Sequence, residues 1–337
     1  MAEVNYQVPV IQTNYAKILV QMFSDYGLNL HQLLEDSGLP PDLIQSDSDF
    51  VPSESIKRLI YLTSVQLGVS KFTDLLGLAF RRRIIPHVLH QFVDYQTIGD
   101  ALQHIGKIFS NDSPGSRVSL EEEHGQTWFC RQALDDDSPK FQWGEAFAII
   151  YIIELITILS NRPWQPTKIR LQGNESDVVS TITTSHCQIY VQQEKTSVMI
   201  PDDILHLPIQ LTSKDLSPKP SLVEWHTSFT DSVYELLKPY VKEQDLSIED
   251  AAQLLNFSVR TFQRKLKQEN TSFRKIKENL MYSVACELME QGHTLTYISS
   301  QLGYTNISHF SRAFKRVSGL TPKIYQRSIS ENKLTGS

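Results

Sequence analysis

A helical layout that occurs twice after residue 246 constrains the fold of this chain most strongly. In each copy, a short helical pattern is followed by a turn and by a second helical pattern with a polar outer side. The first copy begins at Ser247 and reads SIEDAAQLLNFSVRTFQRKLKQE, and the second begins at Leu295. Two helices joined by such a turn form a helix-turn-helix unit. No stretch in this region alternates with the period of a strand, so the sequence predicts an all-α domain here.

The first unit carries clear start signals for both of its helices. Ser247 and Asp250 form a variant of the capping box that opens a helix. Asn256 and Phe257 are expected to form the turn, and Ser258 to cap the second helix. Arg can bind guanine with two donors and Gln can pair with adenine, so the outward row of this helix predicts base contacts. The candidates are Ser258, Arg260, Gln263, Arg264 and Lys267.

The second unit repeats this layout with shorter polar side chains at its start. Leu295–Leu302 forms the first helix, and Gly303 is expected to close it in a left-handed conformation. A turn at Tyr304–Asn306 precedes the helix Ile307–Val317. Its outward residues offer fewer long donors than the first unit, so we expect more contact with phosphates and DNA shape. They are Ser308, His309, Arg312, Lys315 and Arg316.

A long helix is predicted between the two units. Apolar residues at Ile276, Leu280, Val284 and Leu288 have helical spacing within Phe273–Gln291. This helix would hold the two recognition helices at a fixed separation. Two helices about 34 Å apart could enter successive major-groove turns on one face of a DNA duplex. The predicted partner of this region is therefore double-stranded DNA.

The length of 337 residues favours two domains, because a single core rarely grows to this size. Pro218 and Pro220 lie in a stretch with few apolar residues, which is typical of a linker. We predict an effector-sensing or dimerisation domain at 1–210, a linker at 211–220 and a DNA-binding domain at 221–337.

The charge is divided unevenly along the chain. From Val241 onward there are 14 Lys or Arg and 9 Asp or Glu, a net of +5. The first 240 residues hold the remaining 18 basic and 29 acidic residues, a net of −11, so that the whole chain carries −6. Such a division of charge is expected when only one of the two domains binds the phosphates of DNA. A solvated basic face on an ordinary helical domain is the other interpretation.

The N-terminal region is predicted to be mixed α+β. Asn14–Tyr26 has helical spacing, and Ser53 is expected to cap a second helix. The most apolar run, Phe147–Leu159, is interrupted by Glu154 and is shorter than a membrane span, so we expect a buried helix within Trp143–Leu159. Four short strands are also predicted, at 116–120, 126–132, 169–172 and 188–192.

No targeting signal or enzyme motif is found in the sequence. Met1–Val10 has no basic stretch followed by an apolar run, so we expect a cytoplasmic protein with no membrane association. Gly-rich phosphate loops, Gly-x-Ser-x-Gly and His-Glu-x-x-His are absent. A DNA-repair methyltransferase with a regulator-like domain would need clustered cysteines, but Cys130, Cys187 and Cys286 are far apart. We therefore expect no enzyme, no cofactor and no metal.

The stretch LGYTNISHFSRAFKRVSGLTPKIYQR resembles the signature of AraC/XylS-type transcriptional regulators. The similarity covers about Leu246–Arg327 and includes Gly303-Tyr304, Phe310, Arg312-x-Phe314-Lys315, Gly319 and Pro322. The resemblance implies one monomer that reads two adjacent groove segments. By position, it implies base-facing roles for Arg260, Gln263 and Arg264 in the first unit and for Ser308, His309 and Arg312 in the second.

The N-terminal domain is also similar, more loosely, to the ligand-sensing domain of AraC-type regulators related to the ornithine-utilisation regulator. The similarity runs from about Ile11 to Pro208 and includes Ile98-Gly99-Asp100-Ala101-Leu102, Trp164-x-Pro166 and His186-Cys187-Gln188-Ile189. This resemblance implies effector binding or dimer formation, without naming the effector.

Two features of the N-terminal domain have alternative interpretations. Trp128, Trp143 and Tyr151, with Trp164, are candidates for an effector pocket, but aromatic residues among strands and helices also form core. The run Arg81–Arg83, followed by His87 and His90, could bind an anion, or it could complement a helix end and be solvated.

The sequence therefore predicts an α+β sensor domain followed by an all-α domain with two helix-turn-helix units joined by a long helix. The expected function is a sequence-specific transcription regulator, an activator, that responds to a small-molecule effector. RNA polymerase and a second copy of the chain are further expected partners. The alternative is a DNA-binding regulator whose N-terminal domain only dimerises and binds no ligand.

Overall fold

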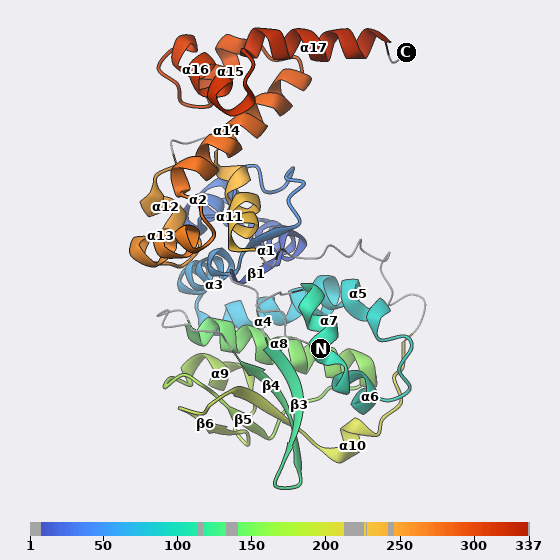
Figure 1. Cartoon of the computed structure of the whole chain (residues 1–337). Helices are drawn as coiled ribbons and strands as arrows, with labels where there is room; N and C mark the ends of the chain where they lie inside the picture. The colour runs from blue at the N-terminus through green and yellow to red at the C-terminus, as the bar shows by residue number, and fades with distance from the viewer. Residues whose placement is uncertain are drawn as a thin grey trace. The chain divides into compact units, whose positions relative to one another are not determined.

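The computed structural model describes residues 8–112, 117–132, 141–211, 226, 228–241 and 246–335 (Figure 1). The chain forms two compact units. The N-terminal unit comprises Pro9–Leu39 and Asp49–Trp225, and the C-terminal unit comprises His226–Ser337 with Met1–Val8 and Pro40–Ser48. Apart from Leu211, the predicted linker at 211–220 lies outside the described residues.

Helices make up most of the N-terminal unit, and many of them are short. The unit begins with β1 (Val10–Gln12), which pairs antiparallel with β2 (Phe50–Pro52). Its helical segments are α1 (Thr13–Asp25), α2 (Leu30–Ser37), α3 (Ser53–Leu67), α4 (Val69–Ala79), η1 (Phe80–Ile84), α5 (Ile85–Val88), η2 (Leu89–Gln91), α6 (Ile98–Gln103), α7 (Ile105–Asp112), α8 (Phe141–Ser160), α9 (Asp177–Ile182) and α10 (Asp202–Leu205).

The start of α3 differs from the prediction. Ser53 is the first residue of the helix, and Pro52 occupies the N-cap position without a side-chain hydrogen bond. The chain is held extended up to Pro52 by the pairing of β2 with β1, and the Ser53 amide donates to the Pro9 carbonyl at 3.1 Å. The prediction of Ser53 as N-cap is therefore wrong, because strand pairing sets where the helix begins.

A five-stranded sheet forms the other part of the N-terminal unit, in the order β3-β4-β7-β5-β6 (Figure 1). β5 and β6 are parallel, and the other neighbours are antiparallel. The strands are β3 (Arg117–Glu123), β4 (Gln126–Gln132), β5 (Lys168–Arg170), β6 (Gln188–Tyr190) and β7 (Thr196–Ile200). The four predicted strands are confirmed. The central strand β7 was missed, because its residues TSVMI are buried almost throughout, including the polar Thr196 and Ser197, and so show no alternating pattern.

The long helix α8 is the main core helix of this unit. It is longer than the predicted apolar run, and Gln142–Ser160 could cross a membrane by length and composition, so the expectation that it is too short is wrong. However, 78% of this segment is buried in the unit, as predicted for a core helix. Its packing partners include Phe72, whose ring lies edge-on to Trp143 at 5.4 Å between centroids.

Glu154 of α8 is buried and is neutralised from a neighbouring segment. The carboxylate receives hydrogen bonds of 2.6 and 2.8 Å from Arg81 Nε and Nη2. Arg81 lies in the π-helical turn η1, which continues directly into α5. The arginine run therefore does not lie at a helix end, and the dipole interpretation is wrong, whereas Arg82 and Arg83 are exposed, as the solvated interpretation expects. Arg81 instead satisfies a buried carboxylate, which would otherwise be costly in an apolar helix.

The regular secondary structure in the described part of the C-terminal unit consists of helices (Figure 1). Large side chains from successive helices form its core, among them Phe229, Phe262, Phe310 and Phe314. The segments are α11 (Phe229–Leu237), η3 (Lys238–Tyr240), α12 (Ile248–Leu254), α13 (Val259–Gln268), α14 (Phe273–Glu290), α15 (Leu295–Gln301), α16 (Ile307–Ser318) and α17 (Pro322–Thr335). The predicted all-α fold with two helix-turn-helix units and a connecting helix is confirmed.

Candidate DNA interface

The first helix-turn-helix unit, α12 and α13, is held by local backbone bonds that the sequence specifies. Ser247 and Asp250 form a reciprocal capping box at the start of α12. Asn256 then takes a left-handed conformation with φ of 59°, which Asn tolerates better than most residues. The Ser258 hydroxyl accepts from the Thr261 amide at 3.2 Å and caps α13. Ser258, predicted as a DNA contact, thus has a structural role as the helix cap.

A row of long polar side chains covers the outer face of α13. All four predicted contacts on this helix after Ser258 are exposed: Arg260, Gln263, Arg264 and Lys267. Among the described residues, none of the four side chains makes a hydrogen bond or ion pair. The opposite face is buried through Phe262 and Leu266. The helix is therefore fixed by its apolar side while its polar side remains available to a partner.

The second unit, α15 and α16, is closed by a glycine and an asparagine. Gly303 has φ of 72°, the left-handed conformation expected from the sequence. The Asn306 side chain accepts from the His309 amide at 2.9 Å and caps α16. Phe310 and Phe314 are buried below this helix. The predicted outward residues are all exposed: Ser308, His309, Arg312, Lys315 and Arg316.

The polar side chains of α16 are more engaged within the protein than those of α13. Arg316 Nη2 donates to Glu278 Oε1 of α14 at 2.9 Å, and Arg274 also binds this carboxylate. His309 Nδ1 lies 3.3 Å from the Thr305 hydroxyl. Among the described residues, Ser308, Arg312 and Lys315 make no side-chain hydrogen bond or ion pair. Arg316 therefore braces α16 against the connecting helix.

The connecting helix α14 separates the two units. Its 18 residues correspond to about 27 Å at the usual helical rise. Ile276, Leu280 and Val284 are buried along one side. Tyr282 of α14 also packs against Phe314 of the second unit, with 4.9 Å between ring centroids. A packed helix of this length is suited to keep two recognition helices apart at about the spacing of one DNA turn, which is roughly 34 Å.

Two capped helix-turn-helix units on one rigid connector are the architecture of a DNA-binding transcription regulator. The family described as the arabinose-binding domain of AraC transcription regulators matches residues 27–209, more than half of the chain. A family of helix-turn-helix domains matches residues 251–328. The chain therefore belongs to the AraC family of transcription regulators.

The individual relatives each match about a quarter of this chain. An uncharacterized HTH-type regulator of Mycobacterium tuberculosis is 42% identical over 79 residues, which are 23% of this chain and 23% of the relative. The regulators AdiY and Rns of Escherichia coli are each 34% identical, over 28% of this chain and 38% and 36% of their own lengths. The chain thus spans less than two-fifths of these relatives. All three are transcription regulators, in agreement with the expectation that this chain is no enzyme.

Solved structures add two similar chains. The regulator CdpR of Pseudomonas aeruginosa is 15% identical, with a TM-score of 0.35 over 94% of this chain and 99% of that chain. The C-terminal domain of AraT from Geobacillus stearothermophilus is 28% identical, with a TM-score of 0.27 over 29% of this chain and 84% of that chain.

The three candidates for an effector pocket do not come together. Tyr151 packs against Phe109, which in turn contacts Phe129 of β4. Trp128 precedes Phe129 and points to the opposite face of the sheet, because side chains alternate along a strand. Trp143 lies against Phe72, within the helical core. Trp143 and Tyr151 are thus core residues, and Trp128 belongs to a separate surface of the sheet.

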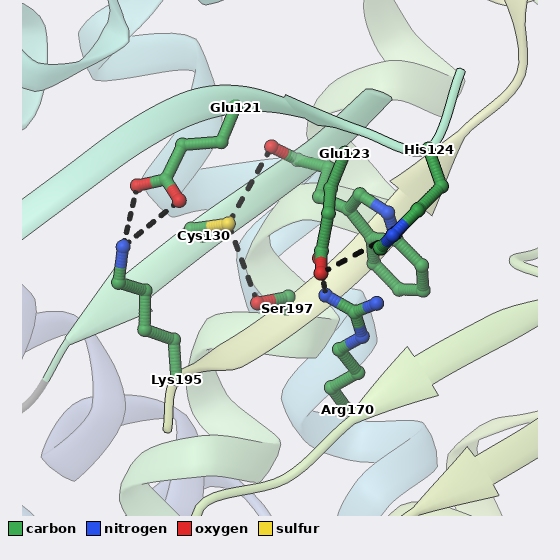
Figure 2. A network of polar contacts seen from close by, with 8 residues as sticks. Glu121, Glu123, His124, Cys130, Arg170, Lys195 and Ser197 are labelled. Atoms are coloured by element: carbon green, nitrogen blue, oxygen red, sulfur yellow. Dashed lines mark hydrogen bonds and ion pairs between the residues drawn. The ribbon is translucent and has the colours of Figure 1, made fainter. Parts of the chain in front are cut away.

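Trp128 lies next to Arg170, which belongs to the network of charged side chains that Figure 2 shows. The Arg170 guanidinium is 3.9 Å from the centre of the indole ring and also binds Glu123. Beside it, Lys195 Nζ lies 2.8 Å from both carboxylate oxygens of Glu121. Trp128 is 2% exposed, and its Nε1 has no hydrogen-bond partner among the described residues. Arg170 and Lys195 were not predicted, because their pairing depends on the order of the strands.

Two cysteines of the N-terminal unit have environments that disfavour the thiolate. Burial raises the pKa of the Cys130 thiol, which accepts a hydrogen bond from Ser197 at 3.3 Å. Burial also raises the pKa of Cys187. Because the thiolate is the reactive form, both side chains act as packing groups. Among the described residues, no cluster of His, Cys, Asp and Glu could hold a metal ion.

Proposed function

We propose that this chain binds double-stranded DNA at specific sequences, with α13 and α16 in successive segments of the major groove. The observation that carries the proposal is the row of four exposed, unpaired polar side chains on α13, above a buried Phe262 and Leu266. Arg260, Gln263 and Arg264 contact base edges. Lys267, together with Lys315 and Arg316 of the second unit, contacts phosphates.

The proposed regulator is a cytoplasmic activator that works with RNA polymerase and responds to a small-molecule effector. Support for an effector comes from the match of the N-terminal part to a domain described as arabinose-binding in AraC regulators. Two relatives that are transcriptional activators, FapR and CfaD of Escherichia coli, support activation. The domain limits 1–210, 211–220 and 221–337 belong to the same proposal, as does a dimer formed through the N-terminal domain.

Recovery of genomic DNA fragments on the purified full chain tests specific binding. The control is an Arg264→Ala/Arg312→Ala double variant, whose two substitutions lie on exposed helix faces. Discrete fragments that share one motif and are lost with the variant are expected. Diffuse recovery by both proteins, with and without a mixture of metabolites, would contradict the proposal.

The second candidate function is a regulator whose N-terminal unit only dimerises. It differs from the first in one measurable property, because a ligand that binds the folded state raises the unfolding temperature. A thermal-shift screen of the full chain against common metabolites is therefore informative. A saturable increase with one chemical class supports effector sensing, and no increase with any class favours dimerisation alone.

A further inference from the structure

Glu269 joins the first recognition helix to the helix that opens the C-terminal unit. It follows directly after α13, and its carboxylate receives three hydrogen bonds from the start of α11. The Phe229 amide donates to Oε1 at 2.9 Å, and the Thr230 amide donates to Oε2 at 2.8 Å. The Ser228 hydroxyl lies 3.1 Å from Oε2. One side chain thus satisfies two amides that no helix can satisfy internally.

The three hydrogen bonds between Glu269 and the start of α11, called the Glu269 clamp below, favour the charged carboxylate. Burial alone would raise the pKa of Glu269, but the hydrogen bonds from Thr230, Phe229 and Ser228 outweigh it and lower the pKa. The carboxylate also lies at the positive end of the α11 dipole. Because the group is ionised at neutral pH, the clamp is present under the conditions in which the protein would meet DNA.

Aromatic packing reinforces the clamp next to it. Phe229, the first residue of α11, packs edge-on against Phe257 of the turn at 5.5 Å and against Phe262 of α13 at 6.0 Å. The Lys265 ammonium lies 5.2 Å from the Phe229 ring centre. Phe229 is completely buried. The start of α11 and the first recognition helix therefore form one packed body.

The far end of α11 is tied to a different element. Lys238, which follows α11, lies 2.7 Å from Glu287 of the connecting helix α14. Among the described residues, no hydrogen bond or ion pair joins α11 to α16 of the second unit. A displacement of α11 would thus act directly on α13 and only indirectly on α16.

We propose that Glu269 is a positioning residue that couples α11 to the first recognition helix. It thereby determines the orientation in which α13, but not α16, binds DNA. In the sequence, α11 is the first described helix after the predicted linker. A movement that the N-terminal unit imposes on α11 therefore reaches the first DNA segment before the second. This inference rests on the proposed DNA-binding function.

Hydroxyl-radical footprinting of the full chain on a recovered operator tests the coupling. The Arg264→Ala and Arg312→Ala variants first assign each protected segment to α13 or α16. Glu269→Gln is expected to lower protection of the α13 segment, with about a tenfold loss of affinity, and to leave the α16 segment protected. Glu249→Gln is the matched control, because it removes the same charge from an exposed position outside the clamp.

A second variant keeps the test valid if Glu269→Gln disturbs folding. Ser228→Ala removes one of the three donors, together with the N-cap hydrogen bond from the Asp231 amide, and leaves the two amides bound to Glu269. A smaller loss at the same α13 segment, about threefold, is expected because only one of the three hydrogen bonds to Glu269 is removed. Unchanged footprints for both variants, or equal loss over both segments, would overturn the coupling alone. Absence of any discrete operator for the unaltered chain would overturn the proposed function and the coupling together.

Discussion

The two helix-turn-helix units share one interior design and differ in how their outer faces are used. Each packs a phenylalanine below its recognition helix, Phe262 in α13 and Phe310 in α16. Among the described residues, the side chains of Arg260, Gln263, Arg264 and Lys267 on α13 are unpaired, whereas on α16 Arg316 is bound to Glu278. The buried residues thus fix the position of each recognition helix, and the exposed residues determine which part of the DNA it can contact. The first unit is suited to base reading, and the second to phosphate contact and bracing.

The largest expected effect tests the shared interior. Phe262→Ala and Phe310→Ala each remove a fully buried ring and are expected to cost about 3–5 kcal/mol of stability. Amide hydrogen exchange measures this loss locally, in the helices around each ring. Similar losses in both units are expected. A loss in one unit only would show that the two cores are not equivalent.

The next effect separates the two outer faces. Arg264→Ala should cost about 1–3 kcal/mol of DNA-binding free energy and relax the preference at one base pair, if its contact is bidentate. Arg312→Ala is expected to weaken binding more evenly across sequences, since α16 relies more on phosphates. Selection from a randomised operator library measures both preferences. Equal relaxation by the two variants would contradict the difference between the units.

Salt dependence sharpens the assignment within α13. Lys267→Ala should weaken binding equally for all sequences and reduce the slope of log K against log salt by about 1, because one phosphate contact is lost. Gln263→Ala carries no charge change and serves as the comparison. It should alter sequence preference while the slope stays the same. Titrations at several salt concentrations provide the slopes.

Loss of the ion pair between Arg316 of α16 and Glu278 of α14 should have a smaller effect. Glu278→Gln frees Arg316 and Arg274 from a partly exposed ion pair and should cost only about 0–1 kcal/mol of stability. DNA binding should become tighter and more dependent on salt, because Arg316 no longer has to leave Glu278 to bind phosphate. The measurement is the Kd at low and moderate salt. Weaker binding would mean that the brace is needed to orient α16.

The smallest expected effect concerns acid stability. The pKa of Glu269 is lowered in the folded state, so its stabilising contribution is present above the unfolded value of about 4.3. It is lost as the pH falls through the lower, folded value. Unfolding of the full chain and of Glu269→Gln between pH 3 and 7 shows the difference. The stability advantage of the unaltered chain should shrink toward acid pH, and a constant advantage would contradict this assignment.

Local signals predicted the C-terminal unit well and the N-terminal unit less completely. Ser247, Ser258 and Gly303 act through their own neighbours in the chain, so their roles as caps could be inferred from spacing. Ser53 was assigned wrongly, because the pairing of β2 with β1 determines where α3 begins. Strand β7 was missed, although it is central in the sheet, because non-local pairing defines it.

The limits of prediction are similar for the candidate site. The exposure of Arg260, Gln263, Arg264 and Arg312 follows from helical periodicity, which places them opposite buried phenylalanines. The grouping of Trp128, Trp143 and Tyr151 as one pocket did not follow from any periodicity. The structure places Trp128 on one face of the sheet and the other two in the helical core.

The sequence by itself determined the two helix-turn-helix units, their caps, the polar rows on α13 and α16, and membership of the AraC family. These features depend on residues within one or two helical turns of each other, where spacing and side-chain chemistry are sufficient. Only the tertiary structure decided that Glu269 clamps α11, that Glu278 binds Arg316 and that Arg81 neutralises Glu154. Each of these bonds joins residues 38 or more positions apart. Their meeting depends on how whole helices pack, which no local pattern encodes.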